Sequence, residues 1–179
     1  MLDPALSILI AVAFAALFAV AAWHKLRGPG EFAAVLEAYA LLPRSAVPAF
    51  ARLLPVMELA LAVGLCVPRY ARAAALAASA LLLIYALAMG INLARGRYEL
   101  DCGCLGPDRR RRVSPWMVWR NVVLAATVAL AALPRAARPW SSIDAWTIAA
   151  GAVVAAVLYA AIDRLVAERA RYSNPGAPA

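Results

Sequence analysis

The chain has 179 residues, of which 65% are hydrophobic and only 16% charged, and its net charge at pH 7 is +8. Its mean hydropathy is +0.76, whereas ordinary soluble domains hold about 45–50% apolar and about 25% charged residues. This composition indicates an integral membrane protein without a separate soluble domain. Because arginines flank the apolar runs, lipid headgroups and membrane topology explain the positive charge, and we expect no nucleic-acid partner.

Five apolar segments are predicted to be membrane-spanning helices, because each is long enough to cross the hydrocarbon core of a bilayer. They cover residues about 5–22, 47–67, 73–94, 116–133 and 145–162. The first segment follows Asp3 and lacks a basic start, which favours a retained helix over a cleaved signal peptide. We predict an all-α fold over residues 1–163, a polytopic transmembrane helical bundle with four core helices plus a fifth. Residues 164–179 are predicted to be a polar, disordered tail.

A short amphipathic helix is predicted between the first and second spans. Gly28-Pro29-Gly30 breaks the first helix, and Glu31 to Tyr39 then places apolar residues at helical spacing. Leu41-Leu42-Pro43 ends this segment. We expect the short helix to lie at the membrane surface.

Cys102-Gly103-Cys104 is the most informative motif, and it lies in the polar segment Arg95 to Ser114 between the third and fourth spans. Fully extended, residues i and i+2 lie about 7 Å apart, whereas disulfide-bonded Cα atoms lie about 5.5–6 Å apart. Gly103 permits the bend that a Cys102–Cys104 disulfide needs. The small ring would be strained and easily reduced, which favours electron exchange over a structural staple.

Two other interpretations of Cys102 and Cys104 stay open at this point, a turn clamp without exchange function and a metal site. Zinc normally needs four ligands. The chain offers this pair and a single histidine, His24. No metal site is therefore predicted.

The charge of the cysteine segment bears on thiol reactivity. Residues 95–112 hold six arginines and three acidic residues, a net charge of +3, and a positive field stabilises the reactive thiolate. Asp101, directly beside the pair, opposes this effect. The third cysteine, Cys66, falls near the opposite membrane face and is interpreted as a small apolar filler.

Glu58 lies about eleven residues into the second span, roughly 16 Å deep at helical rise. An ionised, unpaired carboxylate there would cost several kcal/mol, so Glu58 should be protonated or partnered. It could handle protons beside a redox site, or it could be polar glue between helices. Arg120 enters the fourth span from the same side, and we slightly favour it as the partner of Glu58. In the alternative, the Arg120 side chain extends to the membrane interface instead. Asn121 could cap or bridge such a network.

His24 and Lys25 end the first span on the cysteine side. A lone histidine at an interface is more often a hydrogen-bonded anchor than a catalyst. If the protein is an oxidase, a membrane quinone would have to accept its electrons. His24, Lys25 or Arg120 could then donate a hydrogen bond to a quinone carbonyl.

Five short motifs follow one another along the first 125 residues. They are Trp23-His24-Lys25-Leu26, Ala38-Tyr39-Ala40-Leu41-Leu42-Pro43, Leu54-Pro55-Val56-Met57-Glu58-Leu59, Asp101-Cys102-Gly103-Cys104-Leu105-Gly106 and Trp119-Arg120-Asn121. In these motifs and their order the chain resembles the MauE family of methylamine-utilisation proteins, within the wider DoxX-like group of membrane proteins. One departure is Leu105, where the family usually has Phe.

The resemblance implies a multi-pass helical protein of the bacterial cytoplasmic (inner) membrane. Proteins similar to MauE are associated with maturation of methylamine dehydrogenase, whose small subunit is rich in disulfides, alongside a thioredoxin-like partner. The implied function is thiol–disulfide exchange through Cys102 and Cys104 with a thioredoxin-like protein or a disulfide-containing client. The alternative is a non-catalytic membrane scaffold or assembly subunit for a redox enzyme. A weaker third interpretation is a small-molecule carrier built around Glu58 and Arg120.

The charge distribution conflicts with part of this implication. With five spans, twelve lysines and arginines fall on the cysteine side of the membrane and four on the other. The positive-inside rule then places the cysteines in the cytoplasm, whereas making disulfides for an exported client requires the outer face. We favour the outer face on the family resemblance.

Overall fold

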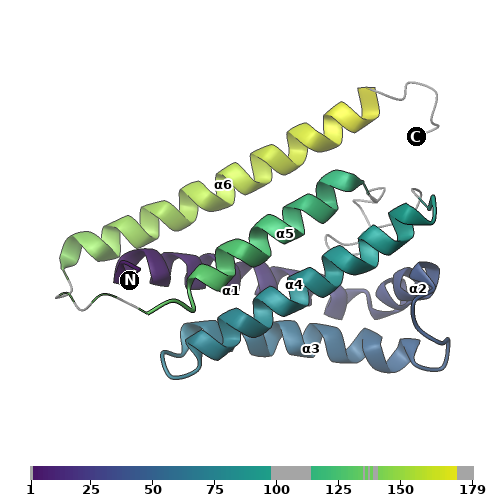
Figure 1. Cartoon of the computed structure of the whole chain (residues 1–179), viewed down its shortest axis with the longest axis horizontal. Coiled ribbons are helices and arrows are strands. Elements are labelled where there is room, and N and C mark those ends of the chain that lie inside the picture. Colours follow the sequence, from purple (N-terminus) through teal and green to yellow (C-terminus); the bar gives the residue numbers. More distant parts are fainter. Residues whose placement is uncertain (1, 98–113, 135, 137, 139–140, 173–179) are drawn as a thin grey trace.

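The chain folds into a bundle of long α-helices (Figure 1). The structure is a computed structural model that describes residues 2–97, 114–134, 136, 138 and 141–172. Within these ranges it has six helices: α1 (Pro4–Arg27), α2 (Pro29–Tyr39), α3 (Val47–Cys66), α4 (Ala71–Ala94), α5 (Pro115–Leu130) and α6 (Ser142–Tyr172). The motif Asp101-Cys102-Gly103-Cys104 lies outside the described residues.

Local sequence determines where the first two helices begin and end. The Asp3 carboxylate caps α1 by accepting a hydrogen bond from the backbone N–H of Ala5 at 2.8 Å, and Pro4 occupies the first helical position. Pro29 begins α2 in the same way, and Ala40 ends it in the left-handed conformation with φ 49°. The short amphipathic helix predicted over 31–39 therefore forms, two residues longer at its start.

Four helices form the core of the bundle, and one long helix lies outside them. α1 packs mainly against α3, α4 packs mainly against α5, and α3 contacts α4. α6 runs along the outside (Figure 1) and contacts α1. This arrangement confirms the predicted all-α bundle of four core helices with a fifth alongside.

The described helices have the length and surface of a multi-pass membrane protein. α1, α3, α4 and the Ser142–Ile162 part of α6 are long and apolar enough to cross a bilayer. α5 has 16 residues, about 24 Å at 1.5 Å per residue, which is shorter than the roughly 30 Å hydrocarbon core. Large apolar side chains face outward on these helices, among them Val56, Leu87 and Val153. A lipid bilayer is the solvent that fits such a surface.

α6 extends into the segment 164–179, for which a disordered tail was predicted. α6 continues past the apolar segment to Tyr172, so residues 164–172 are helical. Once a helix has formed, each further residue adds a backbone hydrogen bond without a new nucleation step. The sequence Arg-Leu-Val-Ala-Glu-Arg-Ala-Arg contains good helix formers and no glycine or proline to stop it.

Small side chains let the core helices approach closely. Ala75 and Ala78 of α4 are fully buried, in one apolar cluster with Phe18 of α1. Lipid tails are as apolar as these side chains, so the hydrophobic effect does not drive helices together within a bilayer. Close van der Waals contact between small residues holds them together instead. A second cluster, Tyr39, Met89 and Met117, joins α2, α4 and α5.

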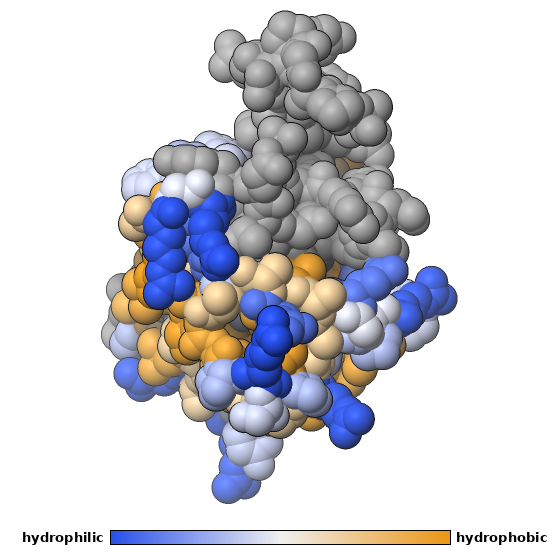
Figure 2. Space-filling model, turned by 90° about the vertical axis from the view of Figure 1, so that its right-hand side faces the viewer, coloured by the Kyte–Doolittle hydropathy of each residue, from blue (hydrophilic) through white to orange (hydrophobic). Residues whose placement is uncertain are grey.

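The two ends of the bundle carry different segments (Figure 1). At one end, here called the cysteine end, α4 ends at Ala94, α5 begins at Pro115 and α2 lies beside α3. Among the coloured residues on this end, hydrophilic side chains lie beside and across a patch of apolar ones (Figure 2). The start of α1, the α3–α4 turn and the α5–α6 connection lie at the opposite end.

Candidate functional site

Three polar side chains from three helices meet inside the bundle. Lys25 of α1 forms an ion pair with Oε1 of Glu58 of α3, and their side chains are 4% and 1% exposed. The hydroxyl of Tyr85 of α4 donates a hydrogen bond to the same Oε1 at 2.8 Å and lies 3.4 Å from the Lys25 ammonium. We call these three residues the inner cluster.

Aromatic rings complete the surroundings of the Lys25 ammonium. Its Nζ lies 5.1 Å from the centre of the Phe32 ring of α2 and 4.9 Å from that of the Tyr85 ring. Ring faces attract cations most strongly where water is excluded. α2 therefore covers the end of α1 and encloses the charge of Lys25, which the sequence alone would place at a wet interface.

Two members of the inner cluster, Glu58 and Tyr85, lie well inside their helices. Glu58 follows Val47, the start of α3, by eleven residues, and Tyr85 precedes Ala94, the end of α4, by nine. At helical rise both lie roughly 14–16 Å from the cysteine end, near the middle of a typical hydrocarbon core. A charge at this depth must be paired, and Lys25 and Glu58 satisfy that demand for each other.

The two oxygens of the Glu58 carboxylate nevertheless differ in their hydrogen bonding. Oε1 contacts both Lys25 and Tyr85, whereas Oε2 is buried and has no hydrogen-bond partner among the residues that the structure describes. Buried carboxylates normally use both oxygens as acceptors, because an idle one has lost its water without compensation.

A cavity of about 70 Å³ adjoins the inner cluster. Helices α1, α2, α3 and α4 all contribute to its wall, which is mainly apolar and aromatic. The lining residues are Lys25, Phe32, Val35, Leu36, Tyr39, Leu54, Tyr85, Ala88 and Met89. Several of these are only half-buried, so the cavity reaches the protein surface between α2, α3 and α4.

Among the described residues, the structure pairs Glu58 with Lys25, which was not expected as its partner, and not with Arg120, the slightly favoured partner. The Arg120 guanidinium carbon instead lies 5.8 Å from the centre of the Tyr159 ring of α6. Asn121 is buried and donates to the Met117 carbonyl of its own helix at 2.9 Å.

His24 occupies the place expected for it near the end of α1, half-buried. Its backbone carbonyl accepts the capping hydrogen bond from the N–H of Gly28 at 3.2 Å. No group of three or more His, Cys, Asp or Glu side chains suited to a metal ion occurs in the part of the chain that the structure describes.

Sequence reasoning missed Tyr85 and Phe32. One signal was available for Tyr85, since Met89 and Asn92 follow it at i+4 and i+7 on one helix face. Met89 and Asn92 are fully buried, and this face of α4 turns inward. Phe32 gave no comparable signal, because its role depends on how α2 folds back over α1.

The described residues that flank the segment with Cys102 and Cys104 lie close to α2. Arg97, the last described residue before that segment, donates to the Ala38 carbonyl at 3.3 Å. Beyond it, Met117 of α5 packs with Tyr39 and Met89. Described residues on both sides of Cys102 and Cys104 thus contact elements that also line the cavity or cover Lys25.

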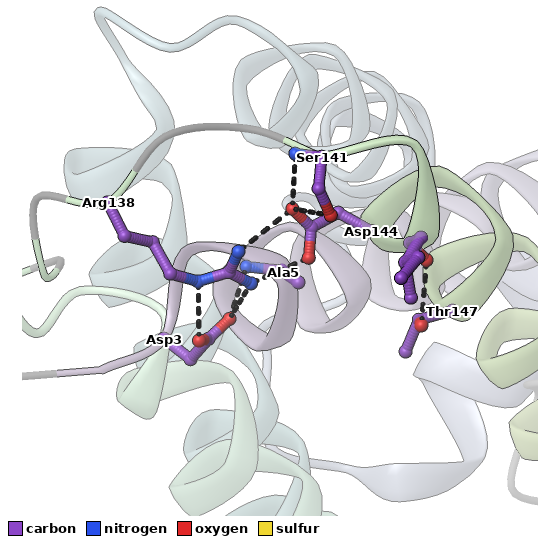
Figure 3. Close-up of polar contacts among 7 residues, drawn as sticks. Asp3, Ala5, Arg138, Ser141, Asp144 and Thr147 are labelled. Atoms are coloured by element: carbon purple, nitrogen blue, oxygen red, sulfur yellow. Dashed lines mark hydrogen bonds and ion pairs between the residues drawn. The ribbon is translucent and has the colours of Figure 1, made fainter.

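A second polar cluster lies at the opposite end of the bundle (Figure 3). Arg138 donates to both oxygens of Asp3 at 2.9 and 3.0 Å and to both oxygens of Asp144 at 2.9 and 2.6 Å. The backbone N–H and hydroxyl of Ser141 add hydrogen bonds to Asp144. We call this the outer cluster. The hydrogen bond from Arg138 lowers the pKa of Asp3 below its ordinary value.

These features define a polytopic α-helical membrane protein with a buried lysine–glutamate–tyrosine site beside a cavity. Residues 3–134 match the family described as methylamine utilisation protein MauE. The chain belongs to this family.

Individual relatives agree with this membership. The chain is 44% identical over 146 residues to a "Methylamine utilization protein MauE" of Paracoccus versutus, covering 81% of this chain and 77% of the relative. It is 37% identical over 166 residues to the protein of that name from Methylophilus methylotrophus, covering 92% and 87%. No solved structure gives a significant match.

Proposed function

We propose that this protein is a thiol–disulfide redox protein of the bacterial inner membrane that acts in methylamine utilisation through Cys102 and Cys104. Its membership of the MauE family supports the process, and the apolar helices support the location. The observation that carries the proposal concerns described residues on either side of Cys102 and Cys104: Arg97 and Met117 both contact the same α2 that covers Lys25.

The proposed step is thiol–disulfide exchange. A thiolate of the client attacks the Cys102–Cys104 disulfide, the S–S bond breaks, and a mixed disulfide forms. A second client thiolate then displaces the membrane cysteine. The client leaves with a disulfide, oxidised by two electrons, and Cys102 and Cys104 are left as thiols. A thioredoxin-like protein working in the reverse direction would use the same intermediate.

Thiol labelling in intact cells tests the proposal. Cys66 is exposed at the end of α3, so the assay uses a Cys66→Ser background and a membrane-impermeant maleimide, with and without prior reduction. Labelling of Cys102 and Cys104 that appears only after reduction would support an oxidised pair on the outer face. Free thiols that react only after lysis would place them in the cytoplasm and overturn the oxidase proposal.

Substitution separates exchange from a scaffold role. Cys102→Ser and Cys104→Ser should each abolish production of active methylamine dehydrogenase in a host that depends on this protein. Normal enzyme production by both variants, at wild-type membrane abundance, would favour the non-catalytic scaffold. Cys66→Ser is the matched control, because it removes a cysteine at the other end of the bundle.

A further inference from the structure

We propose that the cavity between α1, α2, α3 and α4 binds the ring of a membrane-soluble quinone, with one ring carbonyl accepting a hydrogen bond from the Lys25 ammonium. The choice of a redox ligand rests on the proposed function. Oxidation of a client leaves Cys102 and Cys104 as thiols, so a second turnover requires an acceptor for two electrons. The features that suit the cavity to a quinone belong to described residues, and binding is tested without the cysteines.

The wall of the cavity suits a flat apolar ring. It is almost wholly apolar and aromatic, and the side chains of Phe32, Tyr39 and Tyr85 contribute to it. Small-molecule sites are typically lined in this way, with a few placed polar groups that fix the orientation of the ligand. A charged or strongly hydrated ligand would lose its water here for few hydrogen bonds in return. A quinone ring is uncharged and packs favourably against aromatic side chains.

One polar group in the wall retains a hydrogen-bond donor. The Lys25 side chain is 4% exposed, and an ammonium group has three donors. Among the described residues two of them have acceptors, Oε1 of Glu58 and the Tyr85 hydroxyl. Because Lys25 lines the cavity, the third donor is the one that a ligand carbonyl there would use. Of the three donors to a quinone that the sequence suggested, His24, Lys25 and Arg120, it is Lys25 that lines the cavity.

The cavity opens toward the lipid. Half-buried Leu54 of α3 and Ala88 of α4 line it, and their neighbours Leu53 and Leu87 are 49% and 64% exposed. α3 and α4 are both long and apolar enough to cross a bilayer, so these exposed leucines contact lipid tails. At about 70 Å³ the cavity is far smaller than the roughly 300–1,000 Å³ pockets that enclose a whole drug-sized ligand. It therefore takes the ring end of a quinone and leaves the isoprenoid tail in the bilayer.

The cavity also lies beside described residues that flank the cysteine segment. Tyr39 and Met89 line the cavity and pack with Met117, which follows that segment. Arg97, which precedes the segment, donates to the carbonyl of Ala38, the residue next to Tyr39. A quinone in the cavity is therefore near the described residues on both sides of the thiols.

The redox step that this site would serve balances with the quinone as the oxidant. The S–H bonds of Cys102 and Cys104 break and one S–S bond forms, which releases two electrons and two protons. The quinone takes up both electrons and both protons, its two carbonyl oxygens become hydroxyl groups, and the hydroquinone returns to the bilayer.

Photolabelling of the full chain in lipid nanodiscs tests the site. The protein carries Ser in place of all three cysteines, and the probe is a short-chain ubiquinone with an azido group on its ring. The label should appear in the α2 and α4 peptides that line the cavity, and unlabelled ubiquinone should displace it. Ala88→Phe fills the cavity and should lower this labelling about fivefold or more. Leu87→Phe, at the neighbouring exposed position, is the matched control and should not lower it.

Two results of this experiment would overturn the proposal. One is label spread over the lipid-facing helices with no response to Ala88→Phe. The other is labelling of the same peptides by a phospholipid with a photoreactive acyl chain that ubiquinone does not displace, because a lipid chain would then occupy the cavity.

The infrared carbonyl stretch of bound ubiquinone tests the hydrogen bond from Lys25. With 13C placed at each ring carbonyl in turn, one of the two bands should lie at lower frequency than in lipid alone, because a hydrogen bond to an ammonium weakens the C=O bond. The double variant Lys25→Met with Glu58→Leu removes both charges together, so no unpaired buried charge remains. In it the lowered band should return to its position in lipid. A lowered band that persists in the double variant would overturn Lys25 as the donor.

Failure of quinone binding and failure of thiol exchange are distinguishable. Thiol exchange with a client by a protein that binds no quinone would overturn the quinone site and leave the proposed function in place. Quinone labelling of the cavity, together with normal methylamine dehydrogenase production by both cysteine variants, would overturn the proposed function and leave the site in place.

Discussion

The inner cluster pairs one carboxylate with one basic side chain and the outer cluster pairs two, and the clusters differ in burial and in how many carboxylate oxygens are hydrogen-bonded. Glu58 is 1% exposed, and within the described part of the chain its Oε2 has no hydrogen-bond partner. Asp3 is 49% exposed, and each of its oxygens has a hydrogen-bond partner, as does each oxygen of Asp144. All carboxylate oxygens of the outer cluster are therefore hydrogen-bonded, whereas the more deeply buried carboxylate of Glu58 has partners on one oxygen only.

The two clusters also differ in where they lie and in what surrounds them. The outer cluster joins the start of α1 to the start of α6 (Figure 3), where water could replace any bond that is lost. The inner cluster lies wholly within residues 3–134, the part that matches the family, whereas Arg138 and Asp144 lie beyond it. Unsatisfied polarity in a low-dielectric interior is retained at a cost, which points to function more than to stability.

Breaking the inner ion pair should have the largest effect on stability. Lys25→Met and Glu58→Leu should each lower the free energy of unfolding by about 3–5 kcal/mol, because each leaves a buried charge without its partner. The double variant should lose much less than the sum of the two. SDS titration of the protein in mixed micelles measures these values. Additive losses would mean that Lys25 and Glu58 are not energetically coupled.

Removing the Tyr85 hydroxyl should have a smaller effect. Tyr85→Phe keeps the ring that faces Lys25 and deletes the 2.8 Å hydrogen bond to Glu58. Hydrogen bonds to charged groups contribute about 1.5–3 kcal/mol in water-soluble proteins and those between membrane helices about 0.6 kcal/mol on average. The same titration should therefore show a loss of about 1–2 kcal/mol. In Lys25→Met, Tyr85→Phe should have a different effect than in the wild type, and equal effects would contradict a shared cluster.

The fold was predictable because apolar length is a local property. The segments 5–22, 47–67 and 73–94 each contain enough consecutive apolar residues to be recognised without knowing their neighbours, and helices form at each. The end of the last helix was missed at 164–172, because charged residues there are compatible with both a solvated helix and a disordered tail.

The site was predictable only in part. The depth of Glu58 demanded a partner, but sequence does not say which basic residue on the same side provides it. Arg120 was favoured from its membrane level, whereas Lys25 is the partner because α1 and α3 pack against each other. Tyr85 and Phe32 depend on the rotation of α4 and on the return of α2, and neither is encoded in a local pattern.

The contact of α6 with α1 should respond to side-chain size at Gly151. A Cβ placed there would lie 2.9 Å from Cδ2 of Leu9, the far end of a flexible side chain. Gly151→Ala should therefore be accommodated by a small shift of Leu9, whereas Gly151→Leu should separate the two helices. Hydrogen–deuterium exchange of α6 peptides in nanodiscs should rise several-fold in Gly151→Leu only. Similar exchange in both variants would show that the close approach does not hold α6.

Disrupting the outer cluster should have the smallest effect, because its members can exchange each other for water. Arg138→Gln should leave the unfolding midpoint nearly unchanged and raise hydrogen–deuterium exchange only at the start of α6.

Acid should likewise raise hydrogen–deuterium exchange at the start of α6. Because Arg138 holds the pKa of Asp3 below 3.8, the contribution of Asp3 is complete above that pH and is lost as the pH falls through the lowered value. Exchange at the start of α6 should therefore rise below about pH 4 in the wild type, while Arg138→Gln, which already lacks the contact, should respond less. An equal acid response in both would assign the effect to another carboxylate and leave the outer cluster with no measurable part in fastening α6.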